Sequence, residues 1–321
     1  MTHREKFIKA LRHEPITGHV PHFELVFFLT MEKFRKVHPT HRRFDQWGQM
    51  SAHEKELQLA DQAELYIQTA QTYDHSAIFV HQNPGDLEST VRLLELIREK
   101  SGDEYFVMLH ADPTFAMPNG DNMMEFTARM YEDAEGLHEE AKRSLDGLVS
   151  FFTALTGHKG LVDAGALCSD YCFNVNPFFT RDQFAEFVAP YLKQVIAEYH
   201  RLGLFAIKHT DGNIMPILDQ MLDCEPDAFH SLDPQGGVSL AEMKRICGGR
   251  TALIGNVNCG LLQTGTEEEV AADVRRALHD GMPGYGYIFS TSNCVYTGLP
   301  LERYELMWKI WREEGVYPPL A

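Results

Sequence analysis

The 321-residue sequence has no apolar run long enough to cross a bilayer, which takes about 20 residues in a helix. Its first residues, MTHREKFIKALRHE, show an amphipathic helical pattern and no apolar core of the kind found in a secretory signal. Its six cysteines are scattered and form no dense disulfide pattern. These absences predict a reduced, cytoplasmic protein that does not enter a membrane.

Positive charge is also scarce, because 29 basic residues face 46 acidic ones and the formal net charge is −17. A surface this acidic repels phosphate groups. We therefore expect no nucleic acid and no anionic membrane as a partner.

The chain lacks a Pro-, Gly- or Ser-rich linker and any repeat beyond the alternation of strand and helix patterns, so we expect residues 1–321 to form one domain. Eight short apolar segments, each bounded by turn residues, are typical of buried parallel strands. They are 21–28, 76–81, 105–111, 161–167, 204–209, 227–231, 251–256 and 285–290.

Helical patterns lie between these segments, and eight such alternations predict an α/β fold, a (β/α)₈ TIM barrel. A doubly wound open sheet is the alternative. The chain has no Gly-x-Gly-x-x-Gly after the first expected strand, which counts against that fold. Two long excursions, about 29–72 and 113–158, follow the first and third strands and are expected to form lids or substrate-binding walls.

Polar side chains follow the strands where each one ends. The fifth strand ends in AIKHTDGN, which contains His209 and Asp211. Because the carboxyl ends of parallel barrel strands meet at one mouth, we expect an enzyme site there. Residues at or after the ends of the other strands are Glu24, His81, His110, Asp170, Tyr171, Asp233, Asn256, Asn258, Asn293 and Cys294.

Several segments carry a family resemblance. They are T-x-R-E-K at 2–6, NPFFTRDQFAEFVAPYLK at 176–193, KHTDGN at 208–213 and GNVNCGLLQTGTEEEV at 255–270. Together they resemble the uroporphyrinogen decarboxylase superfamily. The resemblance implies a (β/α)₈ barrel. It also implies one of the activities of that superfamily, which include the haem-pathway decarboxylation and methyl transfer between a corrinoid protein and coenzyme M or a folate.

Zinc methyltransferases of this superfamily use a His-x-Cys pair and a distant cysteine as ligands. The resemblance therefore implies a metal site made of His209, Asp211, Asp233 and Cys294, with an aspartate in place of the first cysteine. Only one thiolate is available in this set, so we expect zinc to bind weakly.

The decarboxylases carry an Arg-Gln-Ala-Gly-Arg-Tyr signature after the first strand, whose arginines hold the substrate carboxylates. This chain has Phe23–Leu29 there, with Glu24 and no arginine. Eight carboxylates without cations would be costly to bind. We therefore expect no decarboxylation of uroporphyrinogen.

The preferred hypothesis is a methyltransferase that moves a methyl group between a corrinoid protein, which would carry the cobamide, and a small acceptor such as tetrahydrofolate. A metal-independent lyase acting on a small carboxylated or aromatic substrate is the second hypothesis, and a non-catalytic binding protein is the third. The superfamily also implies a possible homodimer. The expected catalytic residues are His209, Asp211, Asp170 and Tyr171, and the expected substrate-binding residues are Glu24, His81, His110, Asn256, Asn258 and Asn293.

Overall fold

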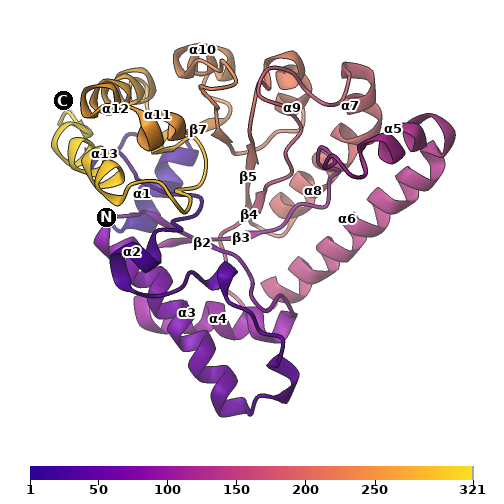
Figure 1. The fold of residues 1–321 in the computed structure, drawn as a ribbon, viewed down its shortest axis with the longest axis horizontal. Coiled ribbons are helices and arrows are strands. Elements are labelled where there is room, and N and C mark those ends of the chain that lie inside the picture. Colours follow the sequence, from indigo (N-terminus) through magenta and orange to yellow (C-terminus); the bar gives the residue numbers. More distant parts are fainter. Residues whose placement is uncertain (320–321) are drawn as a thin grey trace.

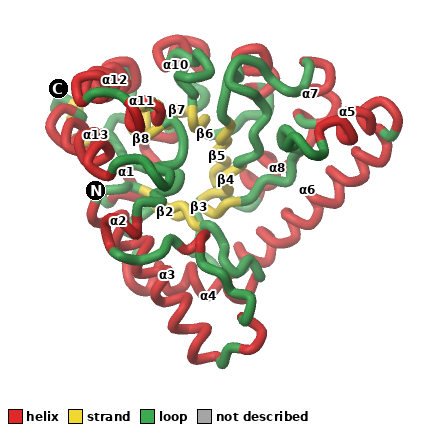
Figure 2. The backbone as a smooth tube through the Cα atoms, viewed as in Figure 1, coloured by secondary structure: helices red, strands yellow, loops and turns green. Residues whose placement is uncertain are grey.

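A computed structural model describes residues 1–319 and contains a curled sheet of seven parallel strands. Their order is β2-β3-β4-β5-β6-β7-β8, which is also their order along the chain. The strands lie at the centre of the molecule and the helices surround them (Figures 1 and 2). The bounds are β2 Ala77–Val80, β3 Phe106–His110, β4 Ala164–Leu167, β5 Phe205–Thr210, β6 Ala228–Ser231, β7 Ala252–Val257 and β8 Tyr287–Thr291.

The segment expected as the first strand, 21–28, closes the gap between β2 and β8 without forming a regular strand. His22 makes single parallel bridges to His75 and to Phe289, and Phe27 makes one to Val295. Between these two bridged positions, the backbone N–H of Thr291 donates to the side chain of Glu24 at 3.1 Å. In a regular pair of strands, a backbone carbonyl oxygen would accept this N–H. The prediction of a regular strand here is wrong because the Glu24 carboxylate takes part of the ladder's place, while the predicted barrel is confirmed.

The remaining elements cover the outside of the sheet, and a short antiparallel pair joins the two ends of the chain. Several helices begin with a capping box, for example at Thr2, Ser51, Thr180 and Thr266. The bounds are α1 His3–Leu11, β1 Gly18–His19, α2 Thr30–Phe34, η1 Pro39–His41, η2 Trp47–Gln49, α3 Ala52–Thr72, α4 Leu87–Ser101, α5 Met123–Glu132, α6 Ala134–Thr156, α7 Arg181–Phe187, α8 Ala189–Arg201, η3 Met215–Ile217, α9 Leu218–Leu222, α10 Leu240–Cys247, α11 Cys259–Thr264, α12 Glu267–Gly281, α13 Leu301–Glu314 and β9 Val316–Tyr317.

The two excursions contain much of the helix outside the regular alternation. Residues 29–72 form α2, two 3-10 turns and α3, and α3 packs beside α4. Residues 113–158 form a loop, α5 and the long α6, which runs along one edge of the molecule (Figure 1). Within residues 1–319, no helix is long and apolar enough to span a bilayer.

The N-terminal end of the sheet is fastened by Asp163, which precedes β4. Its carboxylate accepts hydrogen bonds from Arg4 Nη2 at 2.6 Å, from Arg98 Nη2 at 2.9 Å and from the backbone N–H of Val107 at 2.9 Å. Arg4 belongs to α1, so this network attaches the first helix to the end of the barrel opposite the C-terminal mouth. A paired and saturated carboxylate at that end supports stability and leaves the mouth for chemistry.

Candidate active site at the barrel mouth

Two consecutive residues of β5 point to different surroundings. Lys208 and His209 are both buried, and side chains alternate along a strand. The chain then turns at Gly212, whose φ is +77° and where a Cβ would lie 2.3 Å from the carbonyl oxygen of Phe173. Only glycine fits there, and this tight turn holds Asp211 at the rim of the mouth.

Asp170, His209 and Asp211 form a group able to hold a metal ion, because one ligand atom from each lies within 4.8 Å of the others. His209 Nε2 lies 3.8 Å from Asp170 Oδ1 and 3.8 Å from Asp211 Oδ1. These distances are too long for hydrogen bonds. The backbone N–H of Asp211 donates to Asp170 Oδ1 at 2.9 Å, which fixes the two carboxylates relative to each other.

The side chains of this group are costly to bury together. Burial, with a further contribution from the nearby Asp170 carboxylate, raises the pKa of Asp211 to about 7. Burial also lowers the pKa of His209, although Asp170 opposes that effect. Asp211 Oδ1 is buried and accepts no hydrogen bond from a described residue. A bound cation would relieve each of these costs, so the residues fit a metal ion such as zinc.

Two neighbours hold this group in place from other strands. His209 and His230 are paired in register on β5 and β6, and their Nδ1 atoms lie 2.7 Å apart. Asn293, after β8, donates from Nδ2 to Asp211 Oδ2. Three strand ends therefore converge on the same two side chains.

The Lys208 side chain enters a separate, fully paired network. Its ammonium donates to Asp112 Oδ2 at 2.9 Å and to the carbonyl of Ser169 at 2.8 Å, and lies 4.1 Å from the centre of the Tyr171 ring. Burial alone would raise the pKa of Asp112, but Lys208 and hydrogen bonds from Thr114 and Ser169 outweigh it, so the pKa is lowered. This pair braces the mouth.

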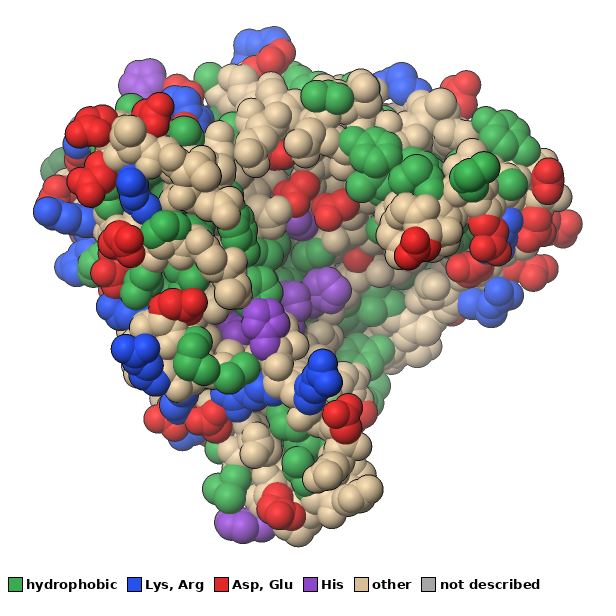
Figure 3. Space-filling view, in the orientation of Figure 1, with side chains coloured by type: hydrophobic (Ala, Val, Ile, Leu, Met, Phe, Trp, Pro, Cys, Tyr) green, Lys and Arg blue, Asp and Glu red, His purple; other side chains and the backbone are tan. Residues whose placement is uncertain are grey.

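Histidines occupy the side of the mouth formed by β2 and β3. The rings of His81 and His110 are stacked with their centres 4.9 Å apart. Burial lowers the pKa of His81 to about 3, with a contribution from His110, so this ring is neutral. The face is hollowed at its centre, with histidine side chains toward β2 and β3 and acidic side chains on the opposite side (Figure 3).

A sequence profile of the family described as uroporphyrinogen decarboxylase matches residues 81–314, which include β3–β8 and the whole Asp170, His209 and Asp211 group. The chain belongs to the uroporphyrinogen decarboxylase family. A search of the curated proteins finds no match.

Solved structures give the fold of this family member. A methyltransferase from Methanosarcina mazei has 17% sequence identity and a TM-score of 0.73, with 98% of this chain and 99% of that chain covered. A beta-mannanase from the blue mussel Mytilus edulis has 10% identity and a TM-score of 0.49, with 94% and 97% covered. D-psicose 3-epimerase from Clostridium cellulolyticum has 9% identity and a TM-score of 0.46, with 77% and 89% covered. At 17% identity, the first likeness describes the fold alone.

The expected metal ligands of this family member are only partly brought together. Asp170 joins His209 and Asp211, whereas Asp233 and Cys294 are not in the group. The Asp233 carboxylate instead accepts from the backbone N–H groups of Gly212 at 3.2 Å and Gln235 at 2.9 Å, which stabilises the two turns. The structure therefore groups Asp170, and not Asp233 or Cys294, with His209 and Asp211, and the metal set expected from the sequence stays a prediction.

Three residues expected to act on substrate are used inside the protein. Tyr171 is fully buried and its hydroxyl lies 2.7 Å from Thr114 Oγ1. Asn256 is fully buried, donates to the carbonyl of Leu232 and accepts from Arg276. The Asn258 side chain accepts from the N–H of Gly260 at 2.8 Å and caps α11. These contacts give each of the three side chains a structural role, and their action on a substrate stays a prediction.

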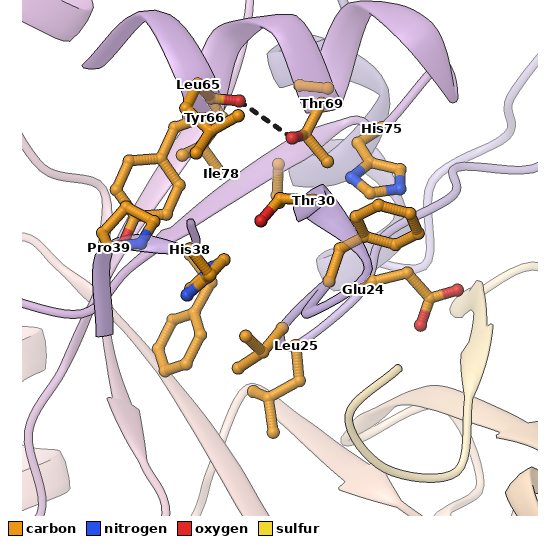
Figure 4. Close-up of a pocket in the computed structure, with 15 residues that line it drawn as sticks. Glu24, Leu25, Thr30, His38, Pro39, Leu65, Tyr66, Thr69, His75 and Ile78 are labelled. Carbon is orange, nitrogen blue, oxygen red and sulfur yellow. Dashed lines mark hydrogen bonds between the residues drawn. The ribbon is translucent and has the colours of Figure 1, made fainter. Parts of the chain in front are cut away.

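Glu24 also lies in the barrel wall. It is buried and bonded to Ser290, Thr291 and His22. Figure 4 shows its carboxylate turned away from Thr30, Tyr66 and Thr69, which line a small cavity of about 30 Å³. That cavity is large enough for one water molecule but not for a substrate.

Sequence reasoning did not single out Lys208, and it placed Asp170 among the catalytic residues and not in the group that could hold a metal ion. A lysine within an apolar strand is a usable signal, because a buried ammonium needs a carboxylate partner. The strand order places Asp170, after β4, next to the end of β5, but it places Asp233, after β6, equally close to that end.

Proposed function

We propose that the protein is a methyltransferase that moves a methyl group between a corrinoid protein and a small acceptor such as tetrahydrofolate, with zinc held by Asp170, His209 and Asp211. The observation that carries the proposal is this three-residue group at the C-terminal mouth, in which Asp211 Oδ1 has no hydrogen-bond partner among residues 1–319. Family membership and the likeness to the Methanosarcina methyltransferase support it.

The side chains have distinct tasks in this scheme. Zinc, when bound, supplies Lewis acidity that favours the deprotonated form of an acceptor. Asn293 donates to one oxygen of Asp211, and the other oxygen, which has no partner among the described residues, would serve as a metal ligand. Asp170, with 42% of its side chain exposed, is the most accessible carboxylate of the group and is placed to take a proton from an acceptor. The His81 and His110 rings form a neutral wall opposite.

A zinc-affinity comparison tests the ligand set. Protein prepared without a chelator is titrated with zinc against a competing indicator. We expect Asp170→Asn to lose at least about tenfold in affinity, because a ligand is removed, and Cys294→Ala to keep the parent affinity. The opposite ranking would assign the metal to the set expected from the sequence.

A methyl-transfer assay tests the activity. Methylcob(III)alamin serves as the donor in place of a corrinoid protein, and tetrahydrofolate or coenzyme M is the acceptor. We expect cob(I)alamin to form at a rate proportional to the enzyme and to fall after chelation. If zinc-loaded protein forms no cob(I)alamin with tetrahydrofolate or with coenzyme M, the proposal is contradicted.

A metal-independent lyase remains a second candidate because of one observation. Burial raises the pKa of Asp211 to about 7, so this carboxyl can exchange a proton near neutral pH beside the His209 ring. Loss of carbon dioxide from a small carboxylated substrate that persists after chelation would favour the lyase.

Uroporphyrinogen itself is not the substrate we propose. Phe23, Leu25 and Phe27 are buried, and Arg42 is bound to Asp61 at 2.7 Å and to the carbonyl of Val37 at 3.0 Å. An anaerobic assay with uroporphyrinogen III should yield no coproporphyrinogen. Enzyme-dependent product would overturn this exclusion, and replacement of Arg35, Arg42 or Arg43 should then abolish it.

A further inference from the structure

A line of buried polar side chains runs from His209 across the barrel interior to the wall segment that contains Glu24. His209 Nδ1 lies 2.7 Å from His230 Nδ1, and His230 Nε2 lies 3.4 Å from Ser290 Oγ. Ser290 Oγ lies 3.3 Å from Glu24 Oε2. His230, Ser290 and Glu24 are all buried, so water cannot replace these contacts.

The direction of donation along this line is fixed from the Glu24 end. Glu24 Oε2 accepts the Ser290 hydroxyl at 3.3 Å and the backbone N–H of Thr291 at 3.1 Å. A hydroxyl has one proton, so toward His230 the same oxygen can only accept.

The same reasoning settles the two imidazole rings. His230 Nε2 must carry the proton that Ser290 accepts, and in a neutral ring Nδ1 is then an acceptor. The His230 ring is buried, where a charged ring is costly, and the two Nδ1 atoms lie only 2.7 Å apart and can share one proton. His209 Nδ1 must then carry the proton shared between the rings, and Nε2 of the neutral His209 ring is left without one.

We propose that His230, Ser290 and Glu24 are positioning residues that fix the His209 tautomer, so that its bare Nε2 faces Asp170 and Asp211 as a ready ligand. This inference rests on the proposed metal site. His209 Nε2 lies 3.8 Å from an oxygen of each carboxylate, which is too far for an N–H donated from Nε2. This distance is consistent with a bare Nε2. Partners behind a ligating histidine commonly set its tautomer and orientation.

The opposite end of the line is also saturated. Glu24 Oε1 lies 3.1 Å from His22 Nε2, and His22 Nδ1 lies 3.0 Å from the carbonyl oxygen of Tyr73. A carbonyl oxygen can only accept, so His22 Nδ1 donates to it, and the contact between His22 Nε2 and Glu24 Oε1 shares one proton. The His22 ring holds the Glu24 carboxylate in place, so that the order of donors toward Ser290 does not reverse.

Ring NMR of metal-free protein tests the proposal directly. Protein labelled with ¹⁵N in the histidine rings is studied at a pH of about 8, above the usual range of imidazole titration. Long-range ¹H–¹⁵N correlations identify which nitrogen of each ring is protonated. We expect the Nδ1–H tautomer at His209 and the Nε2–H tautomer at His230. An Nε2–H tautomer at His209 would overturn the proposal.

Variants at the serine separate positioning from simple support. In Ser290→Ala, His230 loses its acceptor, so we expect both tautomers at His209 and about a tenfold loss of zinc affinity. Ser290→Thr keeps the hydroxyl and should restore both readouts. The control is Ser292→Ala, which removes a buried hydroxyl that accepts only the Cys259 backbone N–H at 3.4 Å. It should leave both readouts unchanged. Unaltered tautomers in Ser290→Ala would overturn the proposal.

The tautomer measurement does not depend on methyl transfer. A protein with the expected tautomers that moves no methyl group would refute the proposed function and support the positioning role. A protein that moves methyl groups but has the reversed tautomers would support the proposed function and refute the positioning role.

Discussion

Asp112 and Asp211 follow strands on the same rim of the barrel, yet their surroundings differ. The side chain of Asp112 is 3% exposed and accepts from Lys208, from the N–H groups of Thr114 and Ser169 and from the Thr114 hydroxyl. The side chain of Asp211 is 27% exposed, accepts from Asn293 and has a buried oxygen with no partner among the described residues. Their pKa values move in opposite directions.

The difference separates a structural carboxylate from a functional one. A buried carboxylate with a full set of hydrogen-bond donors is stabilised by them. If one member of a buried ion pair is removed, the other remains as an uncompensated buried charge, which destabilises the fold. Two carboxylates held side by side repel each other and reduce stability. Such pairs are found at functional sites, where a bound ligand or a proton offsets the repulsion. We therefore expect substitutions at the two sites to change stability with opposite signs.

The largest effect is expected for Lys208→Met. It leaves Asp112 as an unpaired buried charge and should lower the free energy of unfolding at neutral pH by about 3–5 kcal/mol. Urea denaturation followed by circular dichroism measures it. The pKa of Asp112 is lowered in the folded state, so the stability it contributes is present above its usual value of 3.8 and is lost as the pH falls below it.

The double variant Lys208→Met with Asp112→Asn is the control for charge. It removes both charges while changing volume little, so we expect it to recover at least about 1 kcal/mol relative to the single variant. Equal losses in the two variants would show that Lys208 acts through its packing against Tyr171.

The next effect is expected for Asp211→Asn in metal-free protein, which should become more stable. Because the pKa of Asp211 is raised to about 7, the native state keeps a proton that the unfolded chain releases above 3.8. Stability therefore falls as the pH rises through that window, and at pH values above 7 the ionised side chain destabilises the fold. With 27% of the side chain exposed, we expect a gain of about 1–2 kcal/mol at a pH of about 8.

The gain should disappear below a pH of about 4, where Asp211 is protonated in both states. It should also become a loss when saturating zinc is present, since the variant lacks a ligand. If metal-free Asp211→Asn is less stable than the parent protein at high pH, the opposite signs expected for Asp112 and Asp211 are contradicted.

Much of the fold could be predicted from the sequence. The seven regular strands lie within one or two residues of their expected ends, except that β4 begins at Ala164 and not at 161. The helical stretch expected between the fourth and fifth strands forms two helices, α7 and α8, which meet at Val188, just before Pro190. Buried parallel strands and helix caps depend on local patterns, which is why these predictions succeed.

The candidate site could be predicted only by location. A strand end places a residue at the mouth, but which of several polar residues meet depends on register and on donors from distant segments. His230 lies beside His209 because these residues are paired in register on β5 and β6. The Asp233 carboxylate accepts hydrogen bonds from the backbone N–H groups of Gly212 and Gln235. No local pattern carries that information, so Asp170 could not be preferred over Asp233 beforehand.

The smallest effect is expected at Asn258, where a residue of the mouth can be assigned to bracing. Its side chain caps α11 by accepting from Gly260 and Leu261, so Asn258→Ala should cost about 1 kcal/mol in urea denaturation. Asn258→Ser keeps a capping oxygen and should recover most of that loss. Neither variant should change KM for the methyl acceptor, because this side chain faces backbone N–H groups and not the Asp170, His209 and Asp211 group. A tenfold rise in KM with unchanged stability would place Asn258 on the substrate.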